Sequence, residues 1–344
     1  MIRYIVKRIL IMIPVLLAVI VIVFTLTHFM PGDPVRVMLG SNYTQEQYDL
    51  ISARLGLDQP FLTQLWNYIY NLVVHQDFGT SYTTGNPVMQ ELSGRIWISF
   101  KIGLLSCIFT TALAIPLGIL SAVKQNSVLD YIVSFFSILI AALPNFWVAL
   151  MCIIVFCIQL GWLPANGLTG WDSYILPVLC NGTLSIAVTT RQMRSSMLDV
   201  ISQDYIRTAR SKGLSNRETI MHHGLKNAML PVLTVLGSQF SMIIGGSVVI
   251  ENIFGIPGIG SKLISAINSR DYSVVLAIVI LICAFSMAVL LIVDILFAFV
   301  DPRIKAQFEN QGRQWKKKAK AQTVPANAEG ASDVMQDHEE RGGN

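Results

Sequence analysis

Long windows without a charged residue constrain this chain more than any other feature. A helix needs about 20 mostly apolar residues to cross roughly 30 Å of hydrocarbon. Windows close to that length or longer, free of Asp, Glu, Lys and Arg, occur at residues 9–30, 102–123, 173–190, 227–250 and 272–293, with a longer one at 131–171. The sequence therefore predicts an all-α polytopic membrane protein.

The composition of the chain agrees with this class. Of the 344 residues, 53% are hydrophobic and 13% are charged, whereas about 25% are charged in an ordinary soluble domain. The cysteines all lie in apolar stretches, where cysteine behaves as a small buried hydrophobe, and their spacing fits neither a metal site nor a secreted disulfide framework. They are Cys107, Cys152, Cys157, Cys180 and Cys283. We expect neither redox chemistry nor a bound metal.

The first window could be mistaken for a cleaved signal peptide because it follows Arg3, Lys7 and Arg8. Its apolar run is too long for the core of a signal peptide, and Met30-Pro31-Gly32-Asp33 offers no small-residue cleavage site. It is therefore predicted to be an uncleaved anchor.

The window 131–171 is long enough for one crossing or for a tight hairpin bent at Pro144-Asn145. One crossing gives six spans and places both basic ends of the chain on the same side, as the positive-inside rule requires. We therefore expect six transmembrane helices with both termini in the cytoplasm of a bacterial-type cell. In this arrangement residues 128–143 form a helix near the inner face, and residues 146–160 cross the membrane.

The number of basic residues also indicates on which side of the membrane each connecting segment lies. Residues 191–226 carry seven Lys and Arg and are assigned to the cytoplasm, whereas 161–174 carry none and are assigned outside. Residues 31–100 should form a small extracytoplasmic cap, with interfacial helices in the amphipathic stretch 43–57. The expected divisions are 1–98 for the anchor and cap, 99–306 for the membrane-spanning core, and 307–344 for a tail whose composition predicts disorder.

A polar stretch between the fourth and fifth spans predicts a rigid hairpin. Residues 204–212 favour a helix, Gly213 is the residue type that ends a helix in the left-handed conformation, and Ser215 with Glu218 has capping-box spacing. The second helix continues into the span at Pro231. A rigid hairpin joined to two spans can transmit a push to them; the simpler alternative is that its basic residues only fix orientation and contact anionic lipid.

The residue order of this hairpin resembles the cytoplasmic coupling loop of binding-protein-dependent ABC import permeases, specifically the dipeptide/oligopeptide/nickel branch. Two departures from the broader motif E-A-A-x3-G-x9-I-x-L-P occur: Arg207-Thr208 replaces Glu-Ala, and the distance from Gly213 to Pro231 is five residues longer. Both departures fit this branch. The matching positions are Tyr205, Arg207, Thr208, Ala209, Arg210, Lys212, Gly213, Leu214, Ser215, His223, Leu225, Asn227, Ala228 and Pro231.

Further blocks extend the resemblance to about residue 306 and favour the B-type subunit of this branch. They are "RYIVKRILIMIPVL", "PGDP" (31–34), "LGLDQPFLTQ" (55–64), "DFGTSY" (77–82), "ALPNFWVAL" (142–150), "LGWLPANG" (160–167), "ENIFGIPGIG" (251–260), "RDYSVV" (270–275) and "VDILFAFVDPRIK" (293–305). The resemblance implies a type I ABC importer permease fold that pairs with a second, homologous permease.

The resemblance also implies what the coupling loop, residues 195–230, contacts. In this family a coupling helix sits in a cleft of a separate ATPase subunit, so two ATP-binding subunits and an extracytoplasmic substrate-binding protein are expected partners. The implied ATPase-coupling residues are Asp204, Tyr205, Arg207, Thr208, Ala209, Arg210, Lys212, Gly213 and Leu214, with Ala209 expected on the docking face. The implied cargo is a small peptide, with nickel or a nickel chelate as the alternative.

The chain itself offers no phosphate-binding loop. The segment "GIPGIGSK" (255–262) is a near miss, because Gly255 and Gly260 have the right separation but Ser261 stands where the lysine must follow. Its glycines are predicted to shape a re-entrant turn. We therefore expect no cofactor and no enzymatic activity in this chain, with ATP and Mg bound by the partner subunits.

Five polar residues in or beside the spans are weak candidates for the translocation path. Asn181 and Thr183 could bind substrate or hydrogen-bond to neighbouring helices, and Asn145 could line a cavity at a helix break. Glu251 could mark a gate or be solvated. Asp294 is favoured as a structural ion pair or a protonated carboxyl over a substrate contact.

Two other classes of protein compete with a permease subunit. A self-contained secondary transporter or channel would show half-repeats or charges embedded in several spans, and Asp294 alone fits that description. A membrane enzyme would need convergent acid, base or nucleophilic groups, which the sequence does not assemble. Membrane lipid is a further expected contact, and nothing in the sequence predicts a nucleic-acid partner.

Overall fold

A computed structural model describes residues 2–30, 32–40 and 42–300 of the chain. The chain divides into two units, Met1–Ile295 and Leu296–Asn344, and the helical bundle lies in the first. The predicted disordered tail, 307–344, lies outside the described residues.

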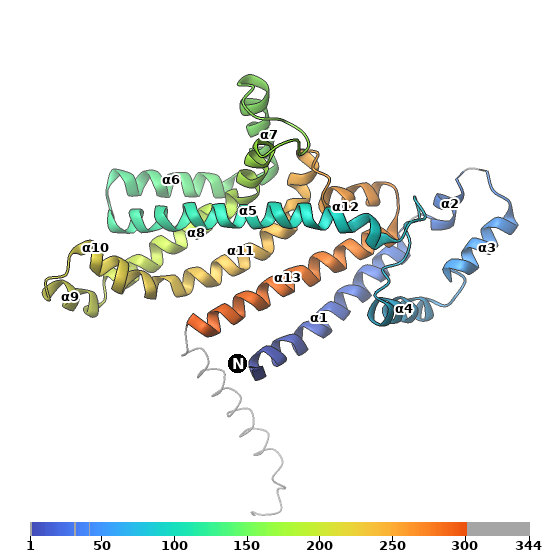
Figure 1. Ribbon diagram of the computed structural model, residues 1–344, viewed down its shortest axis with the longest axis horizontal. Coiled ribbons are helices and arrows are strands. Elements are labelled where there is room, and N and C mark those ends of the chain that lie inside the picture. Colours follow the sequence, from blue (N-terminus) through green and yellow to red (C-terminus); the bar gives the residue numbers. More distant parts are fainter. Residues whose placement is uncertain (1, 31, 41, 301–344) are drawn as a thin grey trace, which may run out of the picture. The chain divides into compact units, whose positions relative to one another are not determined.

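The described residues form helices joined by short turns, together with an isolated antiparallel bridge between Thr80 and Pro87. Figure 1 shows the order of the helices along the chain. Short turns of π-helix follow α4, α7 and α10, at Asn71–His75, Ile153–Gln159 and Thr219–Gly224. The helices are α1 (Ile2–Phe29), α2 (Pro34–Leu39), α3 (Gln45–Leu55), α4 (Phe61–Tyr70), α5 (Val88–Val123), α6 (Val128–Ala142), α7 (Asn145–Cys152), α8 (Ile175–Ile201), α9 (Asp204–Ser211), α10 (Asn216–Glu218), α11 (Leu225–Ile253), α12 (Ile259–Asn268) and α13 (Tyr272–Val300).

The number of spans agrees with the prediction. Among the described residues, four helices are long and apolar enough to cross a membrane, and two bent helix pairs bring the total to six if each pair is one span. The bent pairs are Val128–Ala142 with Asn145–Gln159, at 104°, and Asn216–Ile243 with Ser247–Ile253, at 45°.

The spanning helices are longer than their charge-free windows. α5 begins at Val88, ahead of the predicted start at residue 102, so the expected boundary between residues 98 and 99 falls inside a continuous helix. The charged residue Glu91 lies in this extra length, where its carboxylate is 2.7 Å from Nζ of Lys262 on α12. The window itself stops at Lys101, whereas the helix continues through Lys101, Arg95 and Glu91.

The helices of the third span have nearly the bounds that the sequence predicts. We expected one helix at 128–143 and a second at 146–160; the structure has α6 at Val128–Ala142, followed after a sharp bend by α7 and its π-helical turn at Asn145–Gln159 (Figure 1). α6 runs alongside α5 and α8. Leu143 adopts an extended conformation because a residue before proline is disfavoured in a helix. Asp130 on the first turn of α6 is buried, and its pairing with Arg194 of α8 draws α6 onto the bundle.

Two glycines let α5 and α8 approach closely at the centre of the bundle. A Cβ atom on Gly118 would lie 2.5 Å from Cβ of Met193, and one on Gly182 would lie 2.6 Å from Oγ1 of Thr110. Such small residues allow helix backbones to pack together where no hydrophobic force drives association. α8 is therefore held tightly against α5.

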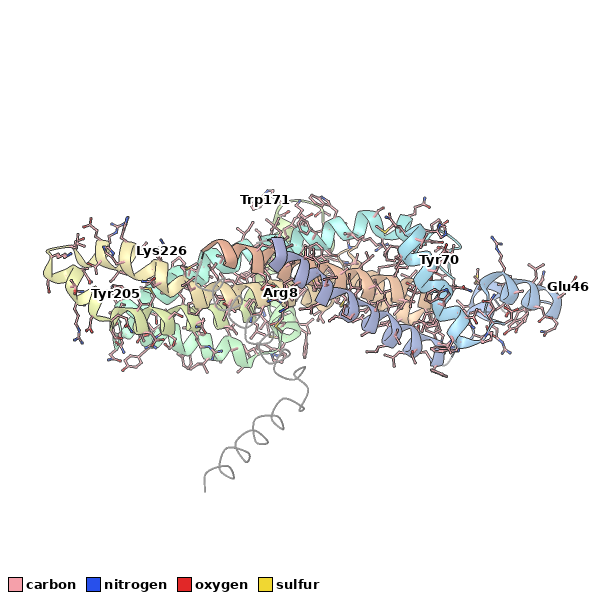
Figure 2. The ribbon with its side chains drawn as sticks, turned by 90° about the horizontal axis from the view of Figure 1, so that it is seen from below. Arg8, Glu46, Tyr70, Trp171, Tyr205 and Lys226 are labelled. Carbon is pink, nitrogen blue, oxygen red and sulfur yellow. The ribbon has the colours of Figure 1, made fainter. Side chains whose placement is uncertain are left out.

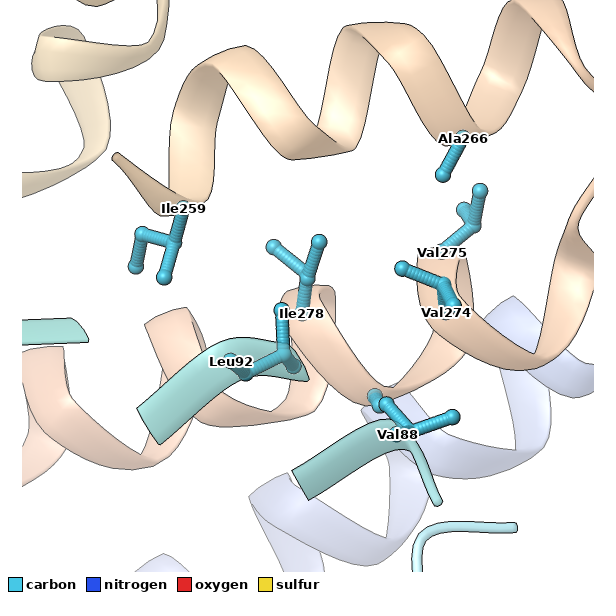
Figure 3. Close-up of a cluster of buried hydrophobic side chains, with 8 residues drawn as sticks. Val88, Leu92, Ile259, Ala266, Val274, Val275 and Ile278 are labelled. Carbon is cyan, nitrogen blue, oxygen red and sulfur yellow. The ribbon is translucent and has the colours of Figure 1, made fainter. Parts of the chain in front are cut away.

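A compact apolar cluster joins α5, α12 and α13 at the end of the bundle away from α9 (Figure 3). α12 follows α11 through a tight turn that contains Gly255 (φ 57°) and packs back against α11 and α5, so the tight turn predicted for the glycine-rich segment is present. α1 packs against α13 through Ile20, Leu276 and Ile280. The cluster in Figure 3 comprises Val88, Leu92, Ile259, Ala266, Val274, Val275, Ala277 and Ile278.

Candidate functional site

The hairpin between α8 and α11, residues 204–224, has the local structure that its sequence predicts. α9 ends at Ser211, and Gly213 follows with φ of 86°, in the left-handed region. Oγ of Ser215 accepts a hydrogen bond of 3.2 Å from the backbone N–H of Glu218, which supplies one half of the predicted capping box. The corner between the two helices is thus defined by one glycine and one serine.

The two faces of α9 differ sharply in exposure. Ile206 is fully buried and Ala209 is 8% exposed, on the side of α9 that meets the π-helical turn Thr219–Gly224. We expected Ala209 on the docking face, and the structure corrects this, because residues three apart share one face of a helix and Ile206 occupies the inner one. The candidate coupling residues that remain exposed are Asp204, Tyr205, Arg207, Thr208, Arg210, Lys212 and Gly213, with Leu214 half-buried.

Contacts fasten the hairpin to the spans on both sides. Nδ2 of Asn227, at the start of α11, donates a hydrogen bond of 2.9 Å to Oη of Tyr205. Ile220 belongs to a buried cluster with Met193 of α8 and Val232 of α11. The hairpin is therefore continuous with the bundle and not a loose connection.

An ion pair between the half-buried Arg194 and the buried carboxylate of Asp130, which we call the Asp130 clamp, fixes α8 about three helical turns before the hairpin. Nε and Nη2 of Arg194 donate to the two carboxylate oxygens of Asp130 at 2.7 and 2.8 Å. Oγ of Ser121 and the backbone N–H of Asn126 donate to the same carboxylate at 2.5 and 3.0 Å. The clamp joins α5, α6 and α8. Arg194 is one of the seven basic residues of 191–226 that were predicted only to fix orientation, and Asp130, an acid at the edge of a charge-free window, is the sequence signal of its pairing.

Glu251, at the last turn of α11, holds the N-terminus of α12. Its Oε2 accepts hydrogen bonds from the backbone N–H groups of Gly260 and Ser261 at 2.8 and 3.3 Å, and Glu251 is fully buried. A Cβ atom on Gly258 would lie 2.2 Å from that oxygen. The backbone donors with which a phosphate loop would bind its anion are thus taken, in this segment, by the carboxylate of the chain itself.

At the other end of α12, Asp271 fastens the cap to the bundle. It is buried, and its carboxylate accepts hydrogen bonds from Oγ of Ser81 at 2.5 Å, from the backbone N–H of Tyr82 at 3.0 Å and from Oγ1 of Thr83 at 2.9 Å. Burial, together with the nearby Asp271 carboxylate, raises the pKa of Tyr82 to about 12. The Tyr82 hydroxyl therefore stays neutral and adds no second negative charge here.

Two glycines with positive φ complete this contact, which we call the cap junction: Gly32 and residues 79–83 against residues 270–273. A Cβ atom on Gly79 (φ 87°) would lie 2.8 Å from Oγ of Ser273, and one on Gly32 (φ 144°) would lie 2.9 Å from Oη of Tyr272. The blocks "PGDP", "DFGTSY" and "RDYSVV" thus meet in space.

The candidate path residues lie in different places. Nδ2 of Asn181 donates to Oγ of Ser106 on α5 at 3.4 Å and to the backbone carbonyl of Ile243 on α11 at 3.3 Å. Oγ1 of Thr183 bonds to a carbonyl of its own helix. Asp294 pairs with Arg8 of α1 at 3.0 Å, Glu251 caps α12, and Asn145 is half-buried at the start of α7.

Comparisons with known proteins identify the family of this chain. The protein-family model of the binding-protein-dependent transport system inner membrane component matches residues 114–306, and the family model of the N-terminal part of the same membrane components matches residues 1–100. The glutathione transport system permease protein GsiC of Escherichia coli K12 is 38% identical over 305 residues, which cover 89% of this chain and 99% of that protein. GsiC of Salmonella typhimurium LT2 is 39% identical over the same shares.

The crystal structure of an amino acid ABC transporter with histidines is 16% identical, with a TM-score of 0.45 over 62% of this chain and 94% of that one. The family models together cover most of the described helices, including the hairpin, the Asp130 clamp and the cap junction. The chain belongs to the family of binding-protein-dependent transport system inner membrane components, as the membrane permease subunit of an ABC importer.

Proposed function

We propose that this permease forms half of a translocation path for small peptides. The supporting observation is its similarity, along nearly their full length, to permeases named for glutathione transport; glutathione is a tripeptide. Peptide backbones offer amide donors and acceptors that neutral polar side chains can bind. The alternative cargo is nickel or a nickel chelate.

The hairpin is the proposed contact with an ATPase subunit. Its supporting feature is the division of α9 into an inner face, with Ile206 and Ala209, and an exposed face with Asp204, Arg207 and Arg210. Two ATP-binding subunits, a second permease and an extracytoplasmic binding protein complete the proposed assembly. This chain supplies no nucleotide site, and ATP with Mg binds to the partners.

The face of α11 that carries Thr234, Ser238 and Met242 is a proposed part of the path. All three side chains are exposed within a bilayer-length helix, and the hydroxyls of Thr234 and Ser238 bond to carbonyls of their own helix. Among the residues expected earlier, Asn145 keeps an exposed part, whereas Asn181 and Asp294 are used to join helices.

The proposed orientation places the hairpin and both termini in the cytoplasm and the cap outside. Ser215 and Asn166 are exposed, so each can report its side when changed to cysteine in a background without the native cysteines. A membrane-impermeant thiol reagent should label Ser215→Cys only from the cytoplasm and Asn166→Cys only from outside. Labelling with the sides reversed would overturn the orientation.

Transport by the assembled complex tests the cargo and the coupling together. Vesicles that contain this permease with the permease, ATPase and binding proteins encoded beside it should accumulate radiolabelled glutathione or dipeptides when ATP is supplied. Uptake of nickel without peptide would contradict the proposed cargo. ATP hydrolysis by this chain after removal of every partner would contradict its role as a passive subunit.

A charge reversal at the exposed face of α9 tests the ATPase contact. Arg207→Glu should reduce co-purification of the ATPase subunits while the permease still inserts, because an unpaired charge at an interface is costly. The matched control is Lys226→Glu, another exposed basic residue just beyond the hairpin. Equal association for both variants would place the contact elsewhere.

A further inference from the structure

The segment from Gln59 through Gln76 contains no Asp, Glu, Lys or Arg, yet it does not cross the bundle. It holds α4 and the π-helical turn Asn71–His75, which together present three faces of different character. At about 100° per residue, residues 61, 65, 68 and 72 form one face, residues 62, 66, 70 and 73 form the next, and residues 63, 67 and 71 form the third.

The first face packs against the spans. The ring of Phe61 lies 5.0 Å from His28 and 6.1 Å from Phe29, and the ring of Tyr68 lies 5.7 Å from Phe24, between ring centroids. Leu72 packs on the cluster that contains Ile20 of α1. α4 therefore meets the last third of α1.

The depth of this contact is set by the length of α1. Arg8 marks one boundary of the membrane, since it is basic and pairs with Asp294, and 20 residues of helix at about 1.5 Å each bring α1 across roughly 30 Å to His28. α4 thus lies at the opposite boundary of the hydrocarbon and reaches down toward Ile20.

The second face is apolar and exposed at this depth. Leu62 is 73% exposed, Trp66 67%, Tyr70 49% and Val73 66%; Figure 2 labels Tyr70. Trp and Tyr are enriched where a membrane meets water. The third face is polar and also exposed, with Thr63, Asn67 and Asn71.

A boundary between lipid and water supplies the environments that both exposed faces require, apolar on one side and aqueous on the other. We propose that α4 and its π-helical turn lie in the membrane surface at the C-terminal end of α1, with Leu62, Trp66, Tyr70 and Val73 inserted among the lipid chains. This role was expected for residues 43–57. α3 in that stretch instead carries the charged residues Glu46, Asp49 and Arg54, so the proposal assigns the role to α4.

Spin labels test the occupant of the apolar face in the assembled complex, reconstituted in nanodiscs of phosphatidylcholine and phosphatidylglycerol. Single cysteines replace Leu62, Trp66 or Val73 in a background without the native cysteines, and each nitroxide is probed with oxygen, which enters lipid, and with a water-soluble nickel chelate. Labels at these positions should be accessible to oxygen and protected from the chelate. Glu46→Cys on α3 and the matched Thr63→Cys on α4 should show the reverse preference.

Two outcomes of the spin-label experiment would overturn the proposal. Chelate accessibility at Leu62 and Val73 equal to that at Thr63 would overturn it by placing the apolar face in water. Labels at Leu62 and Val73 that are immobilised and reached by neither probe would overturn it by showing a protein partner on this face. The two positions lie at opposite ends of the stripe, so a folding defect in one variant leaves the other as the test. None of these outcomes depends on the cargo or on ATPase docking.

Discussion

The hairpin and the cap junction are built in opposite ways. Bonds within the hairpin and at its base join residues close in sequence, such as Arg210 with Asn216 and Tyr205 with Asn227, and most of its side chains are exposed. The cap junction joins Ser81 to Asp271 across 190 positions, and the carboxylate at its centre is buried. The hydrogen bonds of the proposed docking element are thus mostly local, whereas the cap junction centres on a long-range buried carboxylate.

The Asp130 clamp is the exception to this contrast, because it places a buried charge at the hairpin end of the bundle. Arg194→Ala leaves the Asp130 carboxylate buried without its partner, and removal of one partner from such a pair costs about 3–5 kcal/mol. We expect the largest loss of thermal stability from this variant, measured as the unfolding midpoint of the purified complex. The control is Arg191→Ala on the same helix, where an exposed side chain should change stability by no more than about 0.5 kcal/mol. Similar midpoints for both variants would show that the clamp contributes little.

Asp271→Ala removes the acceptor at the centre of the cap junction. The Ser81 hydroxyl, the Tyr82 N–H and the Thr83 hydroxyl lose the carboxylate as acceptor, which costs roughly 1–3 kcal/mol, and the cap should detach before the bundle unfolds. Limited proteolysis should then cut between residues 32 and 87 earlier than in the native protein, with the spans intact. Glu46→Ala, at an exposed position of α3, should leave the cleavage rate unchanged. Unaltered cleavage in Asp271→Ala would mean that apolar contacts alone hold the cap.

Gly213→Val tests the corner of the hairpin by backbone strain alone. No atom lies within 4 Å of a Cβ placed at Gly213, so the effect comes from its positive φ, which costs an L-residue about 1–2 kcal/mol. Substrate-stimulated ATPase activity should fall while membrane insertion persists. Gly213→Asn should retain more activity because asparagine tolerates this conformation. Full coupling in the valine variant would make the hairpin a topological connector.

Ser215→Ala should have the smallest effect of the four. Loss of a serine cap costs about 1 kcal/mol, and the site is exposed, so water can replace the bond to Glu218. We expect faster hydrogen exchange confined to α10 and the following turn, with Ser215→Asn restoring protection. Exchange that also accelerates in α8 would show that the hairpin is less self-contained than its bonds indicate.

The features predicted from sequence are those fixed by neighbouring residues. Charge-free windows gave the spans, and Gly213 with Ser215 gave the corner of the hairpin, because helix ends and apolar length are local properties. Ala209 was misplaced for a related reason. Its spacing from Ile206 was visible, but which of the two faces would be buried depends on the π-helical turn that covers it.

The features that were missed depend on pairs of residues distant in sequence. Arg194 and Asp130 are separated by 64 positions, and neither residue alone indicates that the other is its ion-pair partner. The same holds for Glu91 of α5, which pairs with Lys262 of α12. The bend at Pro144 was foreseen, but the packing of α6 on α8 depends on the clamp and could not be.

Glu251 holds α12 through main-chain N–H groups, which every non-proline residue supplies. The anchor therefore requires no particular side chain at Ser261, while Gly258 and Gly260 are constrained by space, since a Cβ on Gly260 would lie 2.3 Å from Cα of Val248. The exposed side chains of α12 can thus be substituted without loosening its attachment to Glu251. The position of α12 is therefore set by its backbone and its two glycines, whereas the chemistry of its exposed face is set by side chains that play no part in the attachment.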